Sequence, residues 1–261
     1  MAPGQPFRLA LWRRLCGMFQ DPDAGFLDLL PHGVPLGVDD PSAPVPPSSV
    51  MLPSEPDPPR PLPLEHCSSA WQSALSDPTT VDALLAEEVR EGWIRELPGG
   101  LPALQARYRY SAIGKLGLVK YADRPPRLVV DSSVSRVTEN TSLPNRSAYP
   151  GLKDLRRCMP TAPAQEQLTA LVLDVSKAHR RILIRPEDQG LLCFHHRDWL
   201  YQCLTLNFGA RASGLFWSRL AGLLLRLSHR VVYLRHALLI YVDDLLALLP
   251  LSAASVWASV L

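Results

Sequence analysis

The sequence lacks the cysteine patterns that build metal or redox centres. No two of its five cysteines are separated by two residues, which excludes a zinc ribbon and a thioredoxin-type motif. An odd, dispersed set of cysteines is typical of reduced thiols inside a cell. We therefore expect an intracellular protein, nuclear or cytoplasmic. The five are Cys16, Cys67, Cys158, Cys193 and Cys203.

The sequence also lacks an apolar run long enough to cross a membrane. Its longest runs, Leu238–Val242 and Leu245–Leu251, are separated by two aspartates, and each is far shorter than the ~20 residues that a bilayer requires. Near the start, Arg8, Arg13 and Arg14 interrupt the apolar stretch that a secretory signal would need. We expect a soluble protein with no membrane partner, and a mitochondrial presequence stays open as an alternative.

Proline, by contrast, is abundant, with 26 of 261 residues. Twelve of these prolines lie within residues 31–64. Because proline donates no backbone hydrogen bond and this stretch has little apolar mass, we expect it to be extended and disordered. We therefore divide the chain into an N-terminal arm, residues 1–66, and a folded domain, residues 67–261. The apolar segment at residues 7–30 could dock on the domain or bind a partner.

Charge is distributed unevenly along the chain. Residues 1–66 carry four Lys and Arg against eight Asp and Glu, whereas residues 101–261 carry 21 against 11. A basic domain suits a polyanionic partner such as nucleic acid. An ordinary basic soluble protein has the same balance, so charge alone does not separate the two interpretations.

Apolar spacing predicts an α+β domain in which helices cover one face of an antiparallel sheet. A helix should begin near Asp77, with Thr79 or Thr80 as its cap, and end at Gly92. A hairpin is expected at residues 113–131 and a loop at 132–150. Helices are expected at 151–159 and 213–228, and strands at 181–184, 191–194 and 200–204. His195-His196 should lie in a turn rather than form a metal pair.

Three aspartates stand at the ends of apolar strands. Residues 170–174 form an apolar run ending in Asp174, and we expect a buried strand there. Residues 237–249 should form a hairpin with Asp243 and Asp244 at its tip. Adjacent carboxylates raise each other's pKa, a cost that a bound divalent cation such as Mg²⁺ offsets. Asp-Asp alone favours a solvated turn, but the addition of Asp174 favours a metal site.

The order of several segments resembles the sequence blocks of reverse transcriptases. Tyr241-Val242-Asp243-Asp244 resembles their Tyr-x-Asp-Asp box, and residues 171–179 resemble their first catalytic block. Residues 204–213 are similar to the block usually written Leu-Pro-Phe/Gln-Gly. Residues 127–131 resemble a strand of the fingers, and residues 91–94 resemble the segment that precedes the fingers in retrotransposon polymerases. The resemblance covers roughly residues 80–250.

This resemblance implies a right-hand polymerase palm with a fingers subdomain. Asp174, Asp243 and Asp244 would be the catalytic carboxylates. They would bind Mg²⁺ or Mn²⁺ with help from the Val175 carbonyl. Tyr241 would support the primer end. The implied partners are an RNA or DNA template with its primer and the deoxynucleoside triphosphates.

The resemblance also implies a nucleotide site. Arg127 and Lys120 would neutralise the triphosphate. His179 would occupy the steric-gate position, where a bulky ring excludes a ribose 2′-hydroxyl. Phe208 and Gly209 would pack near the nucleotide and the template.

Several departures from the family pattern leave alternatives open. The gate is His179 where Tyr or Phe is usual, and Asn207 replaces a usual proline. The chain ends 17 residues after Asp244, so we expect no thumb within it. One alternative is a relic of the same fold that binds nucleic acid without polymerising. Another is an interaction protein whose proline-rich arm is the functional part.

Overall fold

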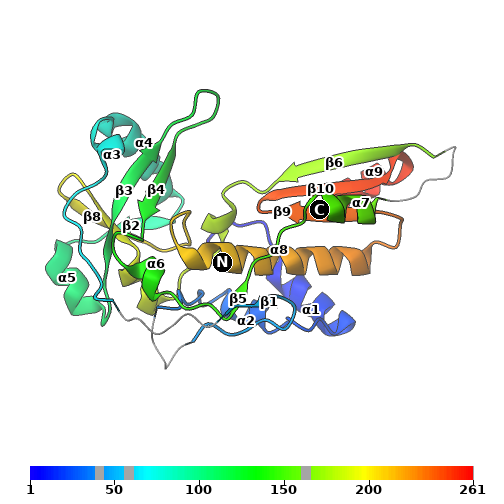
Figure 1. Ribbon diagram of the computed structural model, residues 1–261, viewed down its shortest axis with the longest axis horizontal. Coiled ribbons are helices and arrows are strands. Elements are labelled where there is room, and N and C mark those ends of the chain that lie inside the picture. The colour runs from blue at the N-terminus through cyan, green and yellow to red at the C-terminus, as the bar shows by residue number, and fades with distance from the viewer. Residues whose placement is uncertain (39–43, 56–61, 160–165, 261) are drawn as a thin grey trace.

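The computed structural model describes residues 1–38, 44–55, 62–159 and 166–260, and within them the chain forms two lobes (Figure 1). One lobe holds the strands β2, β3, β4, β7 and β8, and the other holds β6, β9 and β10. The long helix α8 (Arg211–Val231) runs beneath the second lobe, with α1 (Leu9–Phe19) on its other side. The mixed α+β architecture agrees with the expectation from apolar spacing, but the sheet of the first lobe is not wholly antiparallel, because β3 and β7 pair parallel.

The first lobe is built on a sheet whose described strands follow the order β2-β8-β7-β3-β4. The expected hairpin is present, because β3 and β4 pair antiparallel with Lys115 opposite Asp131. Helix α4 (Pro78–Arg90) begins at Asp77, whose side chain accepts from the Thr80 backbone N–H, so the cap is Asp77 rather than a threonine. The strand bounds are β2 Ile94–Glu96, β3 Ile113–Val119, β4 Arg127–Asp131, β7 Cys193–His196 and β8 Trp199–Cys203. The covering helices are α3 Gln72–Leu75 and α5 Gly100–Arg107.

The second lobe is a sheet in which β10 (Asp244–Pro250) lies between β6 (Leu168–Asp174) and β9 (Ala237–Tyr241). Both pairings are antiparallel. The expectation of a buried strand ending in Asp174 is wrong, because alternate residues of β6 are exposed and Val172 is 64% exposed. The reason is position: β6 is an edge strand, and one of its two faces is open.

Helix α8 joins this sheet to the N-terminal residues. Phe216, Leu220 and Leu223 are buried as its helical spacing predicts. The guanidinium of Arg219 forms two hydrogen bonds to the carboxylate of Asp23, and both side chains are buried. Residues 7–30, which contain α1 and α2 (Phe26–Leu29), therefore dock on the rest of the chain.

Part of the proline-rich stretch is also packed against the rest of the chain. Val34, Leu36 and Val45 are buried in the core that includes α8. Strand β1 (Leu52–Pro53) pairs with β5 (Asn145–Arg146). The expectation of disorder over residues 31–64 is wrong for these residues, because the apolar side chains between the prolines find partners. Residues 39–43 and 56–61 lie outside the described part. The hydrophobic core contains residues from both sides of the boundary expected at residue 66.

Smaller differences concern the ends of elements. Residues 181–184 do not form a strand; a 3₁₀ helix, η1 (Ala178–Arg181), ends there. His195 and His196 belong to β7 rather than to the turn, and the turn lies at Arg197 and Asp198. The expected loop at 132–150 contains α6 (Val137–Asn140) and β5, and α7 (Leu152–Cys158) follows it as expected. The remaining elements are η2 (Pro186–Leu191), η3 (Leu251–Ala253) and α9 (Ala254–Val260). Across the described residues, every helix is too short or too polar to span a bilayer.

Candidate active site

Strand pairing brings the three predicted aspartates together at one end of the β6-β10-β9 sheet. Asp244 is the first residue of β10 and lies opposite Asp174, the last residue of β6. Asp243 lies in the turn between β9 and β10, and its carbonyl accepts a hydrogen bond from the Val175 N–H at 3.0 Å. Asp174 is thus a neighbour of Asp243 and Asp244, which follow it by about 70 residues in the sequence. The hypothesis from the sequence required this.

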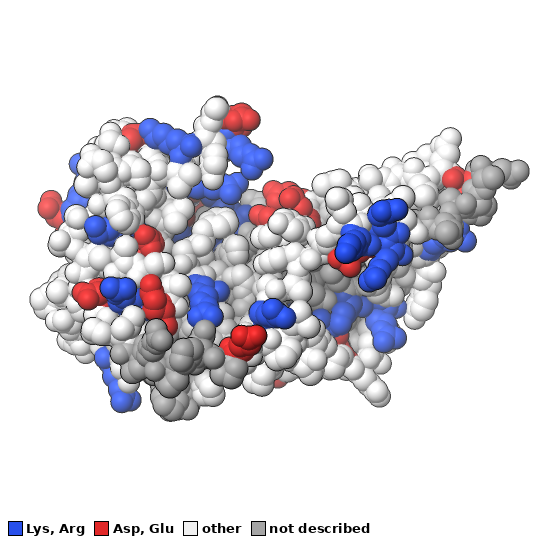
Figure 2. Space-filling model, viewed as in Figure 1, with Lys and Arg blue, Asp and Glu red and all other residues white. Residues whose placement is uncertain are grey.

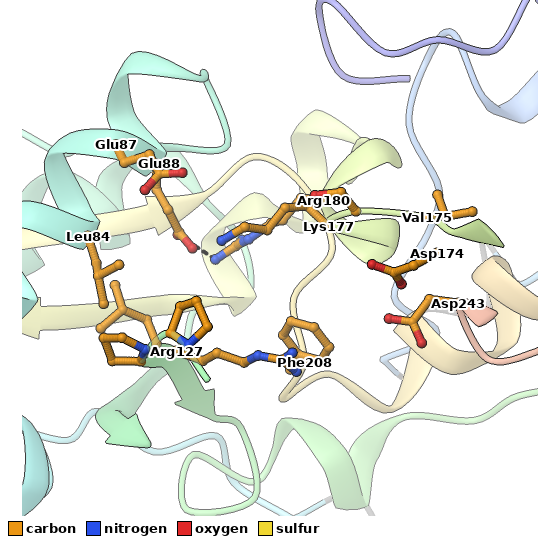
Figure 3. Close-up of a pocket in the computed structure, with 14 residues that line it drawn as sticks. Leu84, Glu87, Glu88, Arg127, Asp174, Val175, Lys177, Arg180, Phe208 and Asp243 are labelled. Atoms are coloured by element: carbon orange, nitrogen blue, oxygen red, sulfur yellow. Dashed lines mark hydrogen bonds and ion pairs between the residues drawn. The ribbon is translucent and has the colours of Figure 1, made fainter. Parts of the chain in front are cut away.

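A cavity of about 200 Å³, here called the central cavity, lies between the two lobes. Of the predicted site residues, Arg127, Asp174, Val175, Phe208 and Asp243 line it. Asp174 and Asp243 point toward one another from the sheet side, and Arg127 and Phe208 lie across from them (Figure 3). Figure 2 shows Lys and Arg gathered on the β3–β4 side of the hollow and Asp and Glu on the sheet side. The cavity therefore has a wall that carries Arg127, here called the basic wall, opposite the wall that carries Asp174 and Asp243, and Glu87 and Glu88 also belong to its lining.

The basic wall begins at Arg127, the first residue of β4. Its guanidinium carbon lies 5.7 Å from the centroid of the Phe208 ring. This cation–π contact holds the long side chain in the cavity without neutralising its charge. Arg127 therefore remains available to an anion that enters beside the two carboxylates.

The second predicted cation is not in the central cavity. The Nζ of Lys120 lies 2.6 Å from the carboxylate of Asp77, at the start of α4. Lys177, which sequence reasoning did not single out, lines the cavity instead. Its backbone φ is 55°, and its Nζ lies 5.6 Å from the centroid of the Trp93 ring. The sequence feature that could have pointed to Lys177 is its position three residues after Asp174.

His179 lies behind the cavity wall rather than on it. The side chain is buried and its ring packs edge-on against Phe208, with centroids 5.1 Å apart. Burial lowers the pKa of His179, and the nearby charge of Asp243 opposes that shift without reversing it. The imidazole is therefore neutral at pH 7 and acts on the cavity through the Phe208 ring.

A buried ion pair, which sequence reasoning missed, supports the same wall. The guanidinium of Arg180 donates to the carboxylate of Glu88 at 2.5 Å, and both line the central cavity. Burial alone would lower the pKa of Arg180, but Glu88 and the hydrogen bonds raise it overall. The signal was the spacing of Val81, Leu85 and Glu88, which places a carboxylate on the apolar face of α4.

Gly209 fills a position where a side chain cannot fit. A Cβ atom there would lie 1.6 Å from the Val130 carbonyl oxygen. The side-chain oxygen of Asn207 accepts from the N–H groups of Gly209 and Ala210, each at 3.0 Å. Asn207 thus fixes the Phe208-Gly209 segment by hydrogen bonds, at the position where the family pattern has proline.

Asp244 and Tyr241 line a different cavity, here called the Tyr241 cavity, together with residues of α7. The Tyr241 ring is more than half exposed and packs at 5.5 Å against the ring of Tyr149. Asp244 therefore does not line the central cavity, although strand pairing places it directly opposite Asp174.

The donor chemistry of the central cavity suits a hard divalent cation. Asp174 and Asp243 offer carboxylate oxygens, which Mg²⁺ and Mn²⁺ prefer, and the open cavity leaves room for phosphate oxygens. Among the described residues, no three His, Cys, Asp or Glu side chains come close enough together to enclose a metal ion.

Comparison with solved structures shows which known fold this chain resembles. No protein-family model matches the sequence, and no curated protein matches it either. Among solved structures, the native protease-reverse transcriptase of prototype foamy virus is similar with a TM-score of 0.50 and 15% identity. Its selenomethionine-labelled CSH mutant gives 0.51 and 14%. Each match covers 71% of this chain and 21% of the viral chain, so the chain spans about a fifth of those structures. The protein therefore has a reverse transcriptase-like fold.

Proposed function

We propose that this chain carries the palm and fingers of an RNA-directed DNA polymerase of a retroelement. The observation that carries the proposal is that Asp174 and Asp243 face Arg127 across one cavity. Two carboxylates opposite a cation are what a nucleoside triphosphate with its metal ion requires. The reverse transcriptase-like fold supports this interpretation, although likeness at 14–15% identity speaks for the fold alone.

Each residue of the cavity has a role in the proposed reaction. Asp174 and Asp243 would hold Mg²⁺ or Mn²⁺, with the Val175 carbonyl nearby. When bound, the metal supplies charge stabilisation for the attacking 3′-hydroxyl and the leaving pyrophosphate. Arg127 would bind the triphosphate of the incoming deoxynucleotide. Phe208 would form the wall beneath the nucleotide, supported from behind by His179.

The proposed template–primer duplex would contact the second lobe. Tyr241 is exposed at the same end of the sheet as the aspartates, which suits contact with the primer end. The template and primer, RNA or DNA, would pass along the open face of the sheet. A purely interacting role for the proline-rich arm has less support, because Val34, Leu36 and Val45 of that arm pack into the core.

Primer extension tests the proposal. The wild-type chain and an Asp174→Asn, Asp243→Asn double variant are compared on a poly(rA)/oligo(dT) duplex with Mg²⁺ or Mn²⁺. We expect metal-dependent extension by the wild type and none by the variant. Fluorescence anisotropy on the same labelled duplex is the control, because removing two carboxylates should not weaken nucleic-acid binding. Duplex binding without extension by the wild type would support the relic alternative instead.

A further inference from the structure

The turn that carries Asp243 is tied to helix α8 by a hydrogen bond from a buried indole. The indole Nε1–H of Trp217 donates to the Val242 carbonyl at 2.6 Å. Trp217 is 1% exposed and does not line the central cavity. Its indole therefore contacts the backbone of the aspartate turn from outside the central cavity.

This turn has a conformation that its sequence does not favour. Tyr241 and Asp244 are paired in the β9–β10 register, so Val242 and Asp243 are the two residues of the loop. Val242 has a φ of 55°, in the left-handed region. Glycine is usual where the first loop residue has positive φ, and a β-branched residue is rare there. An external contact must therefore hold the backbone of this turn.

The contact can do so because Trp217 is itself fixed. It lies on the buried face of α8, and the ring of Phe7 packs against it with centroids 6.4 Å apart. Phe7 packs in the same way against Trp12 of α1, at 5.3 Å. The aromatic rings of the N-terminal residues thus form a support behind Trp217, and α8 runs directly beneath the β9–β10 hairpin (Figure 1).

The turn has a second restraint on its opposite side. The carbonyl of Asp243 accepts from the Val175 N–H, which ties the turn to the end of β6. Successive carbonyls, of Val242 and of Asp243, are therefore held by two different elements. Because both restraints act on the peptide units that flank the Asp243 Cα, they limit the direction in which its carboxylate can point.

We propose that Trp217 is a positioning residue, which holds Val242 in its left-handed conformation and so keeps the Asp243 carboxylate directed at Asp174. This rests on the proposed function in one respect: the pair of carboxylates is taken to bind a divalent metal. The hydrogen bond and the turn conformation do not depend on it.

The sharpest test removes the indole N–H and keeps its shape. Replacing Trp217 with β-(3-benzothienyl)alanine puts sulfur where the N–H stood. Trp217→Phe is a second, genetically encoded variant. The matched control is Trp257→Phe, because Trp257 is equally buried but its Nε1 has no partner within the described residues. Thermal melting of all four chains establishes that each is folded.

The first readout is Mn²⁺ binding to each chain without nucleic acid, followed by electron paramagnetic resonance. Loss of a group that orients a metal ligand typically weakens binding by about 10- to 100-fold. We expect at least about a tenfold loss for both Trp217 variants and no more than about a twofold change for Trp257→Phe. A benzothienyl chain that is folded and binds Mn²⁺ as tightly as the wild type would overturn the proposal.

The second readout separates this inference from the proposed function. In ¹H–¹⁵N spectra, the indole N–H of Trp217 should exchange with solvent at least about 100-fold more slowly than that of the half-exposed Trp199. Equal exchange rates would overturn the proposal even if the chain polymerises. Slow exchange, with Mn²⁺ affinity that depends on the indole, would support it even if the wild-type chain extends no primer.

Discussion

Asp174 and Asp244 lie directly opposite each other across β6 and β10, but they line different cavities. Asp174 faces the central cavity with Asp243, whereas Asp244 faces the Tyr241 cavity. We expect Asp174→Asn and Asp243→Asn each to lower the primer-extension rate at least about 100-fold. Asp244→Asn should lower it less. Steady-state kinetics of the three variants gives the ranking, and an Asp244 variant as damaged as the other two would contradict it.

Lys177, inside the central cavity, and Lys120, outside it, give a matched pair of variants. Lys177 lines the central cavity, whereas Lys120 is paired with Asp77 at the start of α4. Losing a charged contact to the triphosphate should cost about 1.5 kcal/mol, or about tenfold in KM for the deoxynucleotide. We expect this rise for Lys177→Ala and little change in KM for Lys120→Ala. The opposite ranking would show that Lys120 leaves Asp77 when nucleotide binds.

His179 supports the Phe208 ring, and the family resemblance places it at the steric gate. Removing the imidazole in His179→Ala leaves space behind Phe208, so the ring can retreat and admit a ribose 2′-hydroxyl. We expect the ratio of ribonucleotide to deoxynucleotide incorporation to rise roughly tenfold. His179→Phe keeps the bulk and should leave that ratio near the wild-type value. An unchanged ratio in the alanine variant would show that the gate lies elsewhere.

The buried pair of Asp23 and Arg219 should contribute strongly to stability, because an unpartnered buried charge is costly. We expect Asp23→Ala to lower the free energy of unfolding by about 3–5 kcal/mol, measured by urea titration. Asp28→Ala is the control, since its ion pair with Arg13 is exposed and should be worth no more than about 1 kcal/mol. Equal effects would mean that residues 1–30 are not bound to α8 in solution.

The cap of α4 gives a pH-dependent prediction. Hydrogen bonds from Lys120 and Thr80 lower the pKa of Asp77 from 3.8 to about 2. Because the folded pKa lies below the unfolded one, the stabilisation is complete above the unfolded value and disappears as pH falls through about 2. The difference in melting temperature between wild type and Asp77→Asn should therefore be constant near pH 6, shrink as pH falls below 3.8 and vanish only below about 2. A difference that does not shrink as pH falls from 3.8 to about 2 would contradict this assignment.

Local patterns in the sequence predicted the hairpins and the aspartates at their ends well. In both β3–β4 and β9–β10, two apolar runs flank a loop that contains charged residues, so the sequence pattern predicts that the two runs pair. The sequence pattern does not predict that β6 is exposed. Leu171, Val172 and Leu173 are all apolar, although Val172 is open to solvent. An apolar run does not reveal which of its faces another element covers.

The sequence also could not predict the direction in which long side chains point. Lys120 and Lys177 are both cations near family blocks, and the difference between them depends on Asp77, a residue of another element. The packing of the proline-rich stretch depends on partners such as α8, more than 160 residues away along the chain. Interactions over such separations are set by the tertiary fold, which composition does not report.

The link between Asp23 and Arg219 also constrains the order of folding, because 196 residues separate them. A ribosome adding 5–20 residues per second would synthesise the partner roughly 10 to 40 s after the N-terminal segment emerges. During that time Trp12, Phe26 and Leu27 have no α8 to bury against. The nascent chain would therefore expose an apolar N-terminal segment to chaperones or aggregation until helix α8 is complete.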